Sequence, residues 1–228
     1  MSWVSANLDT IAEQLLAHIA QALPAIVLAF VLALPIAKLA NARGWLRGGL
    51  TGTAGLLYAI PSLPLFIVLP LMLGTSIRSP VNIVVALTIY GLALMVPSAS
   101  EALRAVSRET LQAATAQGYA PWARFWRVEL PLAGPALVAG LRVVVVSTVS
   151  LVTVGGVLGV PSLGMLFIDG FQRNITAEIL TGIVLTAALA LLLDALVVLG
   201  GRLALPWASG RAPRRRTAPR DTGQEAAR

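Results

Sequence analysis

The sequence predicts an all-α protein that crosses a membrane about five times. Hydrophobic residues occupy 57% of the 228 positions and charged residues only 12%, roughly half the charged share of an average soluble domain. The mean hydropathy is +0.82, and the apolar residues gather in five stretches long enough for membrane helices. These observations exclude a free-standing soluble enzyme and confine any disorder to the ends of the chain.

Residues 1–21 are predicted to form an amphipathic helix at the membrane surface. Apolar side chains recur at helical spacing from Ile11 to Ile19, and polar side chains such as Glu13 and His18 interrupt them. A helix of this kind lies in the interface with its apolar face in the lipid, so His18 is expected on the polar face. The segment lacks a basic leading region, so we do not expect a signal peptide.

The transmembrane domain is predicted to cover residues 22–206. About 20 apolar residues cross the hydrocarbon core of a bilayer, and the expected spans are 23–40, 56–73, 81–97, 132–158 and 179–205. The second span contains Pro61, Pro64 and Pro70, each of which removes a helix hydrogen bond and favours a kink. Interrupted helices often line a translocation path, although a kinked helix packed against its neighbours is the alternative.

The basic residues predict the topology. Of the 17, 15 fall in the segments 38–47, 101–142 and 202–228, and only Arg78 and Arg173 lie elsewhere. Cytoplasmic loops collect Lys and Arg, so we expect the N-terminus outside and the C-terminus in the cytoplasm. This bias also accounts for the isoelectric point near 11.2 without a nucleic-acid partner. Residues 207–228 are predicted to be a basic, disordered cytoplasmic tail.

Catalytic and metal-binding chemistry is not expected in this chain. It has no cysteine, a single histidine and a single lysine, Lys38, which follows an alanine rather than the glycine of a P-loop. These counts exclude disulfides, Cys/His zinc sites and a nucleotide site of the P-loop type. An intramembrane enzyme is disfavoured because catalytic clusters are missing. If ATP drives the protein, a partner subunit must hold the ATP.

The cytoplasmic loop 101–131 is predicted to contain two short helices. Gly118 is expected to stop the first helix, as glycine does at helix C-termini. Pro121 is expected to open the second helix, and Pro131 to end it. A loop with two helices is too structured to be a mere connection, which favours a docking surface for a partner. The alternative is an interfacial helix that touches only lipid.

The spacing within this loop resembles a known motif. Gln112-Ala113-Ala114 is followed after three residues by Gly118 and, nine residues later, by Val128-Glu129-Leu130-Pro131. The permease subunits of binding-protein-dependent ABC importers carry Glu-Ala-Ala, three residues, Gly, nine residues and Ile-x-Leu-Pro. Here Gln112 replaces the usual glutamate, so only a neutral hydrogen bond is available at that position. The resemblance implies a type I importer permease fold and assigns ATPase docking to Gln112, Ala113, Ala114, Gly118, Leu130 and Pro131.

Three further stretches, 59–63, 129–142 and 155–164, resemble permeases for glycine betaine, carnitine and choline. The resemblance implies a path for a compatible solute such as these or proline betaine, with Ile60, Pro61, Ser62 and Leu63 lining or gating it. Methionine and aliphatic sulfonate permeases share the loop and remain alternatives. The implied partners are an ATPase dimer that carries ATP-Mg, a second permease of the same or a sister chain, an extracytoplasmic binding protein and the bilayer of a bacterial-type inner membrane.

Two ionisable residues within the spans leave another alternative open. Asp194 is the only acid well inside a predicted span, and intramembrane charges are usually functional or paired. A secondary transporter that uses Asp194 and Arg142 is one interpretation. The other is that Asp194 bonds to a neighbouring helix, whereas Arg142 anchors the inner end of its span and reaches Glu101, Glu109 or Glu129.

Overall fold

The computed structural model describes residues 2–209, and within that range the chain forms helices and no strands. The helices in chain order are α1 (Ser2–Ala6), α2 (Leu8–Ala42), α3 (Gly44–Ala59), α4 (Ser62–Leu73), α5 (Pro80–Arg104), α6 (Arg108–Ala116), α7 (Pro121–Arg124), α8 (Leu130–Gly155), α9 (Leu163–Gln172) and α10 (Thr176–Ala204). Four helical stretches among these residues are long and apolar enough to cross a membrane, and a bent pair of helices raises the number to five. The all-α membrane fold is therefore confirmed.

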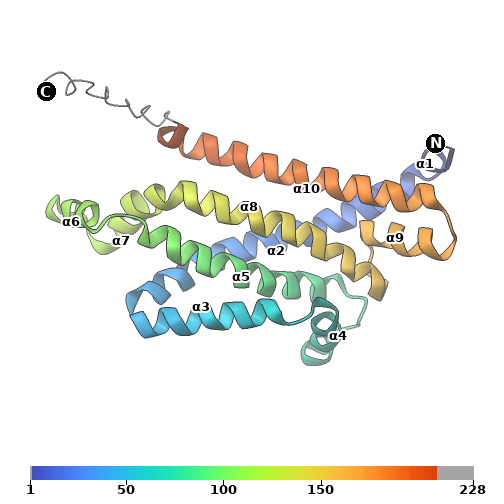
Figure 1. Ribbon diagram of the computed structural model, residues 1–228, viewed down its shortest axis with the longest axis horizontal. Coiled ribbons are helices and arrows are strands. Elements are labelled where there is room, and N and C mark those ends of the chain that lie inside the picture. Colours follow the sequence, from blue (N-terminus) through green and yellow to red (C-terminus); the bar gives the residue numbers. More distant parts are fainter. Residues whose placement is uncertain (1, 210–228) are drawn as a thin grey trace, which may run out of the picture.

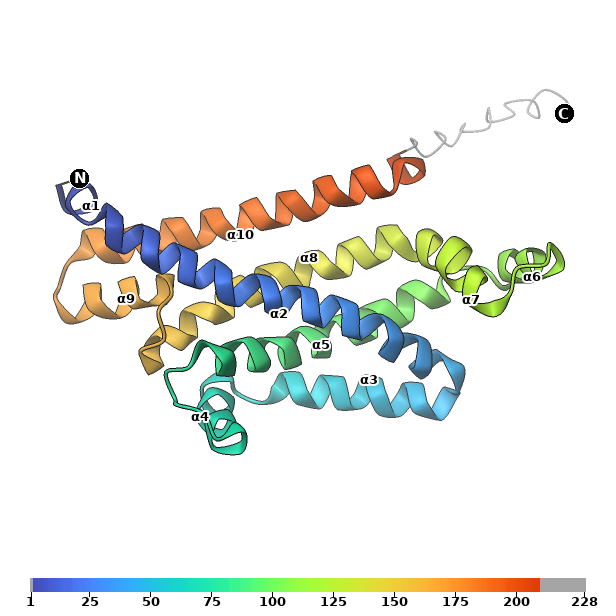
Figure 2. The same cartoon turned by 180° about the vertical axis from the view of Figure 1, so that it is seen from behind.

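Helix α5 lies at the centre of the bundle and packs against α2, α3 and α8 (Figure 1). It is the most buried of the candidate spans, whereas α10 lies at one edge and is the least buried. Helix α2 crosses α5 and α8 and lies in front of them in Figure 2. Its buried alanines Ala25, Ala29, Ala33 and Ala37 recur every four residues, and such a stripe of small side chains lets two membrane helices approach closely.

The outer surface of the bundle is apolar. Large side chains such as Leu71 on α4 and Leu191 and Leu203 on α10 are at least 70% exposed. Soluble monomers rarely leave contiguous apolar surface in water. The exposed faces of α4 and α10 therefore fit a surrounding of lipid or of other membrane helices.

The N-terminal segment differs from the expected surface helix at 1–21. Helix α2 runs without a break from Leu8 to Ala42, so the predicted division between a surface segment and the first span is absent. At 1.5 Å per residue its 35 residues extend over about 52 Å, well beyond a hydrocarbon core of about 30 Å. His18 is fully buried rather than placed on a water-facing side. His18 thus faces another part of the protein, whereas Glu13 remains exposed; a helical period cannot distinguish these two surroundings.

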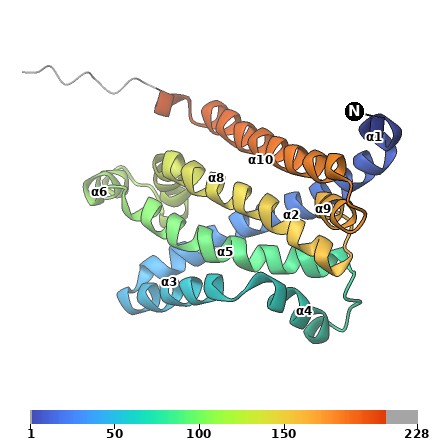
Figure 3. The ribbon, with the colours of Figure 1, turned by 45° about the vertical axis from the view of Figure 1, so that its right-hand side comes forward.

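The second span, predicted as one kinked helix at 56–73, is two helices. Helices α3 and α4 meet at a bend of 102°, visible between the two cyan-green helices in Figure 3. Ile60 and Pro61 between them are both extended, with ψ angles of 127° and 135°. A proline disfavours the helical conformation of the residue before it and cannot donate its own hydrogen bond, so the helix ends and begins again.

The loop after the fourth span contains a helix that the apolar pattern did not predict. Helix α8 ends at Gly155 in a short 3-10 turn, and after a bend α9 begins at Leu163. The Ser162 side chain accepts a hydrogen bond from the Gly164 N–H, as an N-cap residue does. At ten residues, α9 is too short to register as a span. Residues 207–209 of the predicted basic tail belong to a 3-10 turn, Pro206–Ser209. The rest of the predicted tail lies outside the described residues.

Candidate functional site

The predicted docking loop forms a separate lobe at one end of the bundle, where α6 and α7 project beyond the spans (Figure 1). Ser107 caps α6 by accepting a hydrogen bond from the Thr110 N–H at 3.2 Å. Gln112 and Ala113 are exposed on α6, whereas Ala114 is buried. The exposed pair is therefore available to a partner, and Ala114 secures the helix to the protein.

Gly118 makes the turn that the sequence predicted. Its φ angle is +87°, a left-handed conformation in which side chains other than glycine and asparagine are strained. The Gly118 N–H donates to the Thr115 carbonyl at 3.0 Å and the Tyr119 N–H donates to the Ala114 carbonyl at 3.2 Å. These bonds close the C-terminus of α6. A Cβ atom at position 118 would meet nothing within 4 Å, so this turn faces open space.

The second part of the docking loop is continuous with the fourth span. Helix α7 passes into a π-helical turn at Phe125–Glu129 and from there directly into α8. Pro131 therefore does not end the helix as predicted. It lies in the first turn of α8, directly after the π-helical turn, where the N–H that proline lacks is tolerated. Leu130 and Pro131, both half-buried, form the base of the loop rather than its tip.

An ion pair with a buried carboxylate joins this base to the first span. Lys38 on α2 donates to both carboxylate oxygens of Glu129, with an Nζ–Oε1 distance of 2.7 Å. The Glu129 side chain is 6% exposed and that of Lys38 is 43% exposed. The Lys38 ammonium also lies 5.1 Å from the centre of the Phe125 ring, a favourable cation–π distance. Sequence reasoning assigned no role to Lys38, although its position as the only lysine was a usable signal.

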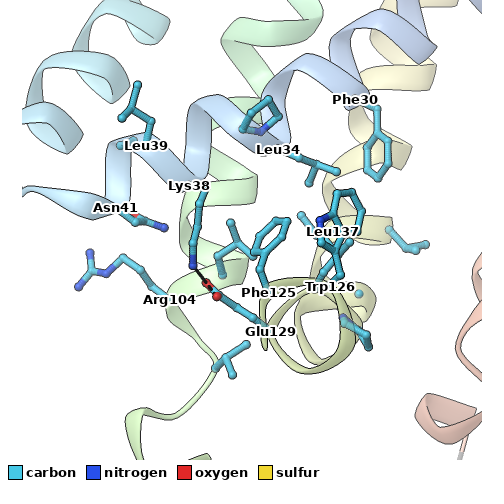
Figure 4. A pocket seen from close by; sticks show the side chains of 18 of the residues that line it. Phe30, Leu34, Lys38, Leu39, Asn41, Arg104, Phe125, Trp126, Glu129 and Leu137 are labelled. Carbon is cyan, nitrogen blue, oxygen red and sulfur yellow. Dashed lines mark hydrogen bonds and ion pairs between the residues drawn. The ribbon is translucent and has the colours of Figure 1, made fainter. Parts of the chain in front are cut away.

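The ion pair lies in a groove of about 2000 Å³ between α2, α5, α8 and α10. Figure 4 shows Phe30, Leu34 and Leu137 along its apolar walls and Lys38 reaching across to Glu129. At the rim, Trp126 packs edge-on against Trp122 and Phe125 with ring centres 5.5 and 5.3 Å apart. The junction between the loop 101–131 and the spans is thus lined by three packed aromatic rings and carries the Lys38–Glu129 ion pair.

The second candidate site, the break at Ile60–Leu63, lies toward the opposite end of the spans (Figure 1). Tyr90 on α5 donates its hydroxyl to the Ile60 carbonyl at 2.6 Å, which satisfies a group that the broken helix leaves unpaired. Ile60 and Leu63 are 39% and 37% exposed, and Pro61 is exposed as well. The structure thus places these residues on an accessible face, separate from the docking residues.

The intramembrane acid has a partner on a neighbouring helix. Arg142 on α8 donates from Nε and Nη2 to the two oxygens of Asp194 on α10, at 2.7 and 2.9 Å. Arg142 therefore does not reach the loop acids Glu101, Glu109 or Glu129. A bidentate pair of this kind is strong and geometrically specific, and it connects α8 to the least buried span.

A buried polar network on α2 was missed by sequence reasoning. Gln14 accepts from the Ser162 N–H at 2.8 Å, Gln21 donates to the Pro161 carbonyl at 2.7 Å, and His18 Nε2 lies 3.1 Å from the Val149 carbonyl. These contacts hold the N-terminal half of α2 against the end of α8 and the turn between α8 and α9. Among residues 2–209, no three His, Asp or Glu side chains gather closely enough to hold a metal ion.

The arrangement of membrane helices is that of the permease component of a transport system. Residues 14–205 match the family described as the binding-protein-dependent transport system inner membrane component, and the chain belongs to this family. The fold is that of an ABC importer permease: one similar solved structure is an inward-facing form of the MetNI methionine ABC transporter, with a TM-score of 0.78 and 19% identity over 87% of this chain and 98% of that one.

The chain is also similar to curated transport proteins. It is 33% identical over 151 residues to the ergothioneine transport permease/ergothioneine binding protein EgtU of Helicobacter pylori, which covers 66% of this chain but only 27% of that longer protein. It is 30% identical over 173 residues to the osmoprotectant import permease protein OsmW of Salmonella typhimurium, covering 75% and 80% of the two chains. The carnitine transport permease protein OpuCD of Listeria monocytogenes is 26% identical over 198 residues, covering 86% and 87%.

Proposed function

We propose that this chain forms the membrane path of an ATP-driven importer for a quaternary ammonium solute such as glycine betaine, choline, carnitine or proline betaine. Its partners are an ATPase dimer that binds ATP-Mg, a second permease of the same or a sister chain, and an extracytoplasmic binding protein that delivers the solute. The chain itself binds no cofactor. The observation that carries the proposal is the docking lobe, in which Gln112, Ala113 and Gly118 are exposed at the spacing of the importer motif.

The lobe suits an ATPase partner for physical reasons. Helix α6 projects from the spans and is only nine residues long, so it can enter a cleft on a soluble protein. The exposed Ala113 allows close approach, and the left-handed turn at Gly118 presents backbone rather than a side chain. Leu130 and Pro131 at the base connect the lobe directly to α8, so that movement of the docked helix reaches a span.

The solute class is supported by the chemistry that the relatives' names share. Ergothioneine and carnitine both carry a trimethylammonium group and a carboxylate, as do glycine betaine and, with two methyl groups, proline betaine; choline carries only the cation. The path in this chain is proposed to run along the exposed break at Ile60, Pro61, Ser62 and Leu63. Cations of this type bind aromatic faces, and Tyr58 packs edge-on against Tyr90 at 6.1 Å beside the break.

The distribution of basic residues in the fold supports the proposed orientation. Arg43, Arg104 and Arg202 lie at the ends of α2, α5 and α10, and these ends are on the side of α6 (Figure 1). Arg78 and Arg173 lie in connections at the opposite end. The positive-inside rule therefore supports the proposal that the α6 end is cytoplasmic, with the N-terminus outside and the C-terminus inside.

The test is uptake by the assembled system in cells that lack their own osmoprotectant importers. The chain is expressed with an ATPase and a binding protein from the same source, and uptake of labelled glycine betaine, carnitine, choline, proline betaine and ergothioneine is measured against methionine and an alkylsulfonate. Uptake of a quaternary amine that requires the ATPase supports the proposal. Uptake of methionine or the sulfonate alone would overturn the solute class, and uptake independent of the ATPase would overturn the importer itself.

A further inference from the structure

The Lys38–Glu129 ion pair stands where the docking lobe, the first span and the fourth span meet. Glu129 is the last residue of the π-helical turn, and Leu130 begins α8. Lys38 lies four residues before the end of α2. The pair therefore crosslinks two segments that are 91 residues apart in the chain, at the point where motion of α6 and α7 would enter the spans.

The π-helical turn is the part of this junction that can change shape. A π turn carries an extra residue relative to an α-helix, and such turns occur frequently at functional sites. In the turn the Leu130 N–H bonds to the Phe125 carbonyl, so a return to α-helical bonding would rotate everything before it relative to α8. Glu129 and Phe125 both contact Lys38, so Lys38 holds both ends of the turn.

Burial makes this pair more than a surface contact. Exposed ion pairs contribute little, but the Glu129 side chain is 6% exposed and a buried carboxylate requires its partner. Lys38, at 43%, keeps access to water. Loss of the Glu129 charge therefore leaves a lysine that water can solvate, whereas loss of Lys38 leaves a buried carboxylate without its cation.

We propose that Lys38 and Glu129 are positioning residues that transmit movement of the docked lobe to α2. The inference rests on the proposed importer function and deepens it: without the pair, the lobe still docks on the ATPase, but its movement is no longer passed to α2. ATP hydrolysis is then no longer matched to solute movement. The property affected is the number of ATP molecules hydrolysed per solute imported, not the attachment of the ATPase.

The first test compares Glu129→Gln with Asp194→Asn in the complete importer reconstituted in liposomes, with its ATPase and binding protein. Glutamine keeps the shape of Glu129 and removes only the charge. Asp194→Asn is the matched control, because it breaks a second ion pair, between α8 and α10, whose arginine side chain is 48% exposed and which lies away from the docking lobe. The ATP hydrolysed per solute imported should rise about tenfold for Glu129→Gln and stay at the wild-type value for Asp194→Asn.

The second test restores the link covalently. The natural chain has no cysteine, so a Lys38→Cys, Glu129→Cys double variant carries a unique pair of thiols. Removing both charges avoids an unpaired buried carboxylate, and replacement of both partners is often tolerated. The open form should hydrolyse ATP with poor solute import, and a short bifunctional thiol reagent should return the ratio toward the wild-type value. A reagent that caps each thiol separately should not.

The outcomes separate this inference from the proposed function. If the wild-type assembly shows no ATPase-dependent uptake, the proposed function has failed. If the wild type transports but Glu129→Gln and the open cysteine variant keep its ratio of ATP to solute, the positioning role is wrong. An equal rise in Asp194→Asn would also overturn it, because the effect would then reflect general loosening of the spans.

Discussion

The contact between α8 and α9 allows a stability prediction whose size follows from the structure. Gly164, in the first turn of α9, is buried against the Thr153 backbone of α8. A Cβ atom at position 164 would overlap the Thr153 carbonyl oxygen and lie 2.7 Å from its carbon. Backbone atoms cannot rotate aside as a side chain does, so Gly164→Ala must push α9 away. We expect the upper end of the overpacking range, about 3 kcal/mol of lost stability.

The assay is thermal unfolding of the purified chain in detergent, followed by the fluorescence of its five tryptophans. For a chain of this size about 3 kcal/mol lowers Tm by about 6–12 °C. The matched control is Gly52→Ala on α3, where an added Cβ meets nothing within 4 Å and the helix should gain about 0.5–1 kcal/mol. A Tm for Gly164→Ala that equals or exceeds that of Gly52→Ala would refute the reasoning.

Three further predictions concern the two candidate sites. Gly118→Leu should insert normally but lose ATPase co-purification and uptake, because the φ of +87° adds about 1 kcal/mol or more of strain and the side chain obstructs docking. Gly118→Asn, which tolerates this φ, should retain more co-purification and uptake than Gly118→Leu. Uptake at the wild-type rate by Gly118→Leu would contradict the docking assignment. Ala113→Asp should abolish co-purification of the ATPase, because it buries an unpaired acid in the docking contact, whereas Gln112→Ala should only weaken co-purification. Equal effects of these two variants would argue against a close contact between α6 and the ATPase. Tyr90→Phe removes the bond to Ile60 and should lower stability by about 1 kcal/mol, with faster hydrogen exchange at 60–63; unchanged exchange there would show that Tyr90 does not hold the break.

The parts of the fold that depend on local pattern were predictable from the sequence. The spans that became α5, α8 and α10 follow from continuous apolar length, because a membrane helix must bond its own backbone within the lipid. The turn at Gly118 follows from motif spacing and from the conformational freedom of glycine. Pro61 indicated an interruption, but whether a proline kinks or breaks a helix depends on what receives the freed carbonyl, and here Tyr90 does so from another helix.

The contacts that join distant segments could not be predicted. Lys38 and Glu129 are separated by 91 residues, Arg142 and Asp194 by 52, and His18 and Val149 by 131. A helical period identifies which residues share a face, but it does not identify what that face meets. Polar residues of α2 such as His18 were therefore expected to face water, whereas in the folded protein backbone carbonyl and amide groups are their hydrogen-bond partners.

The central position of α5 has a consequence for how the two ends of the protein can act together. Tyr90, at mid-helix, holds the break at Ile60, and the same helix ends at Arg104, three residues before the Ser107 cap of the docking helix. Arg104 lies 14 positions after Tyr90, which is about 21 Å along the helix, and a continuous helix resists stretching along its axis. If the proposed ATPase docks on α6 and moves α5 lengthwise, the displacement would reach Ile60 almost undiminished, and the proposed gating at the break would then follow the ATPase cycle directly.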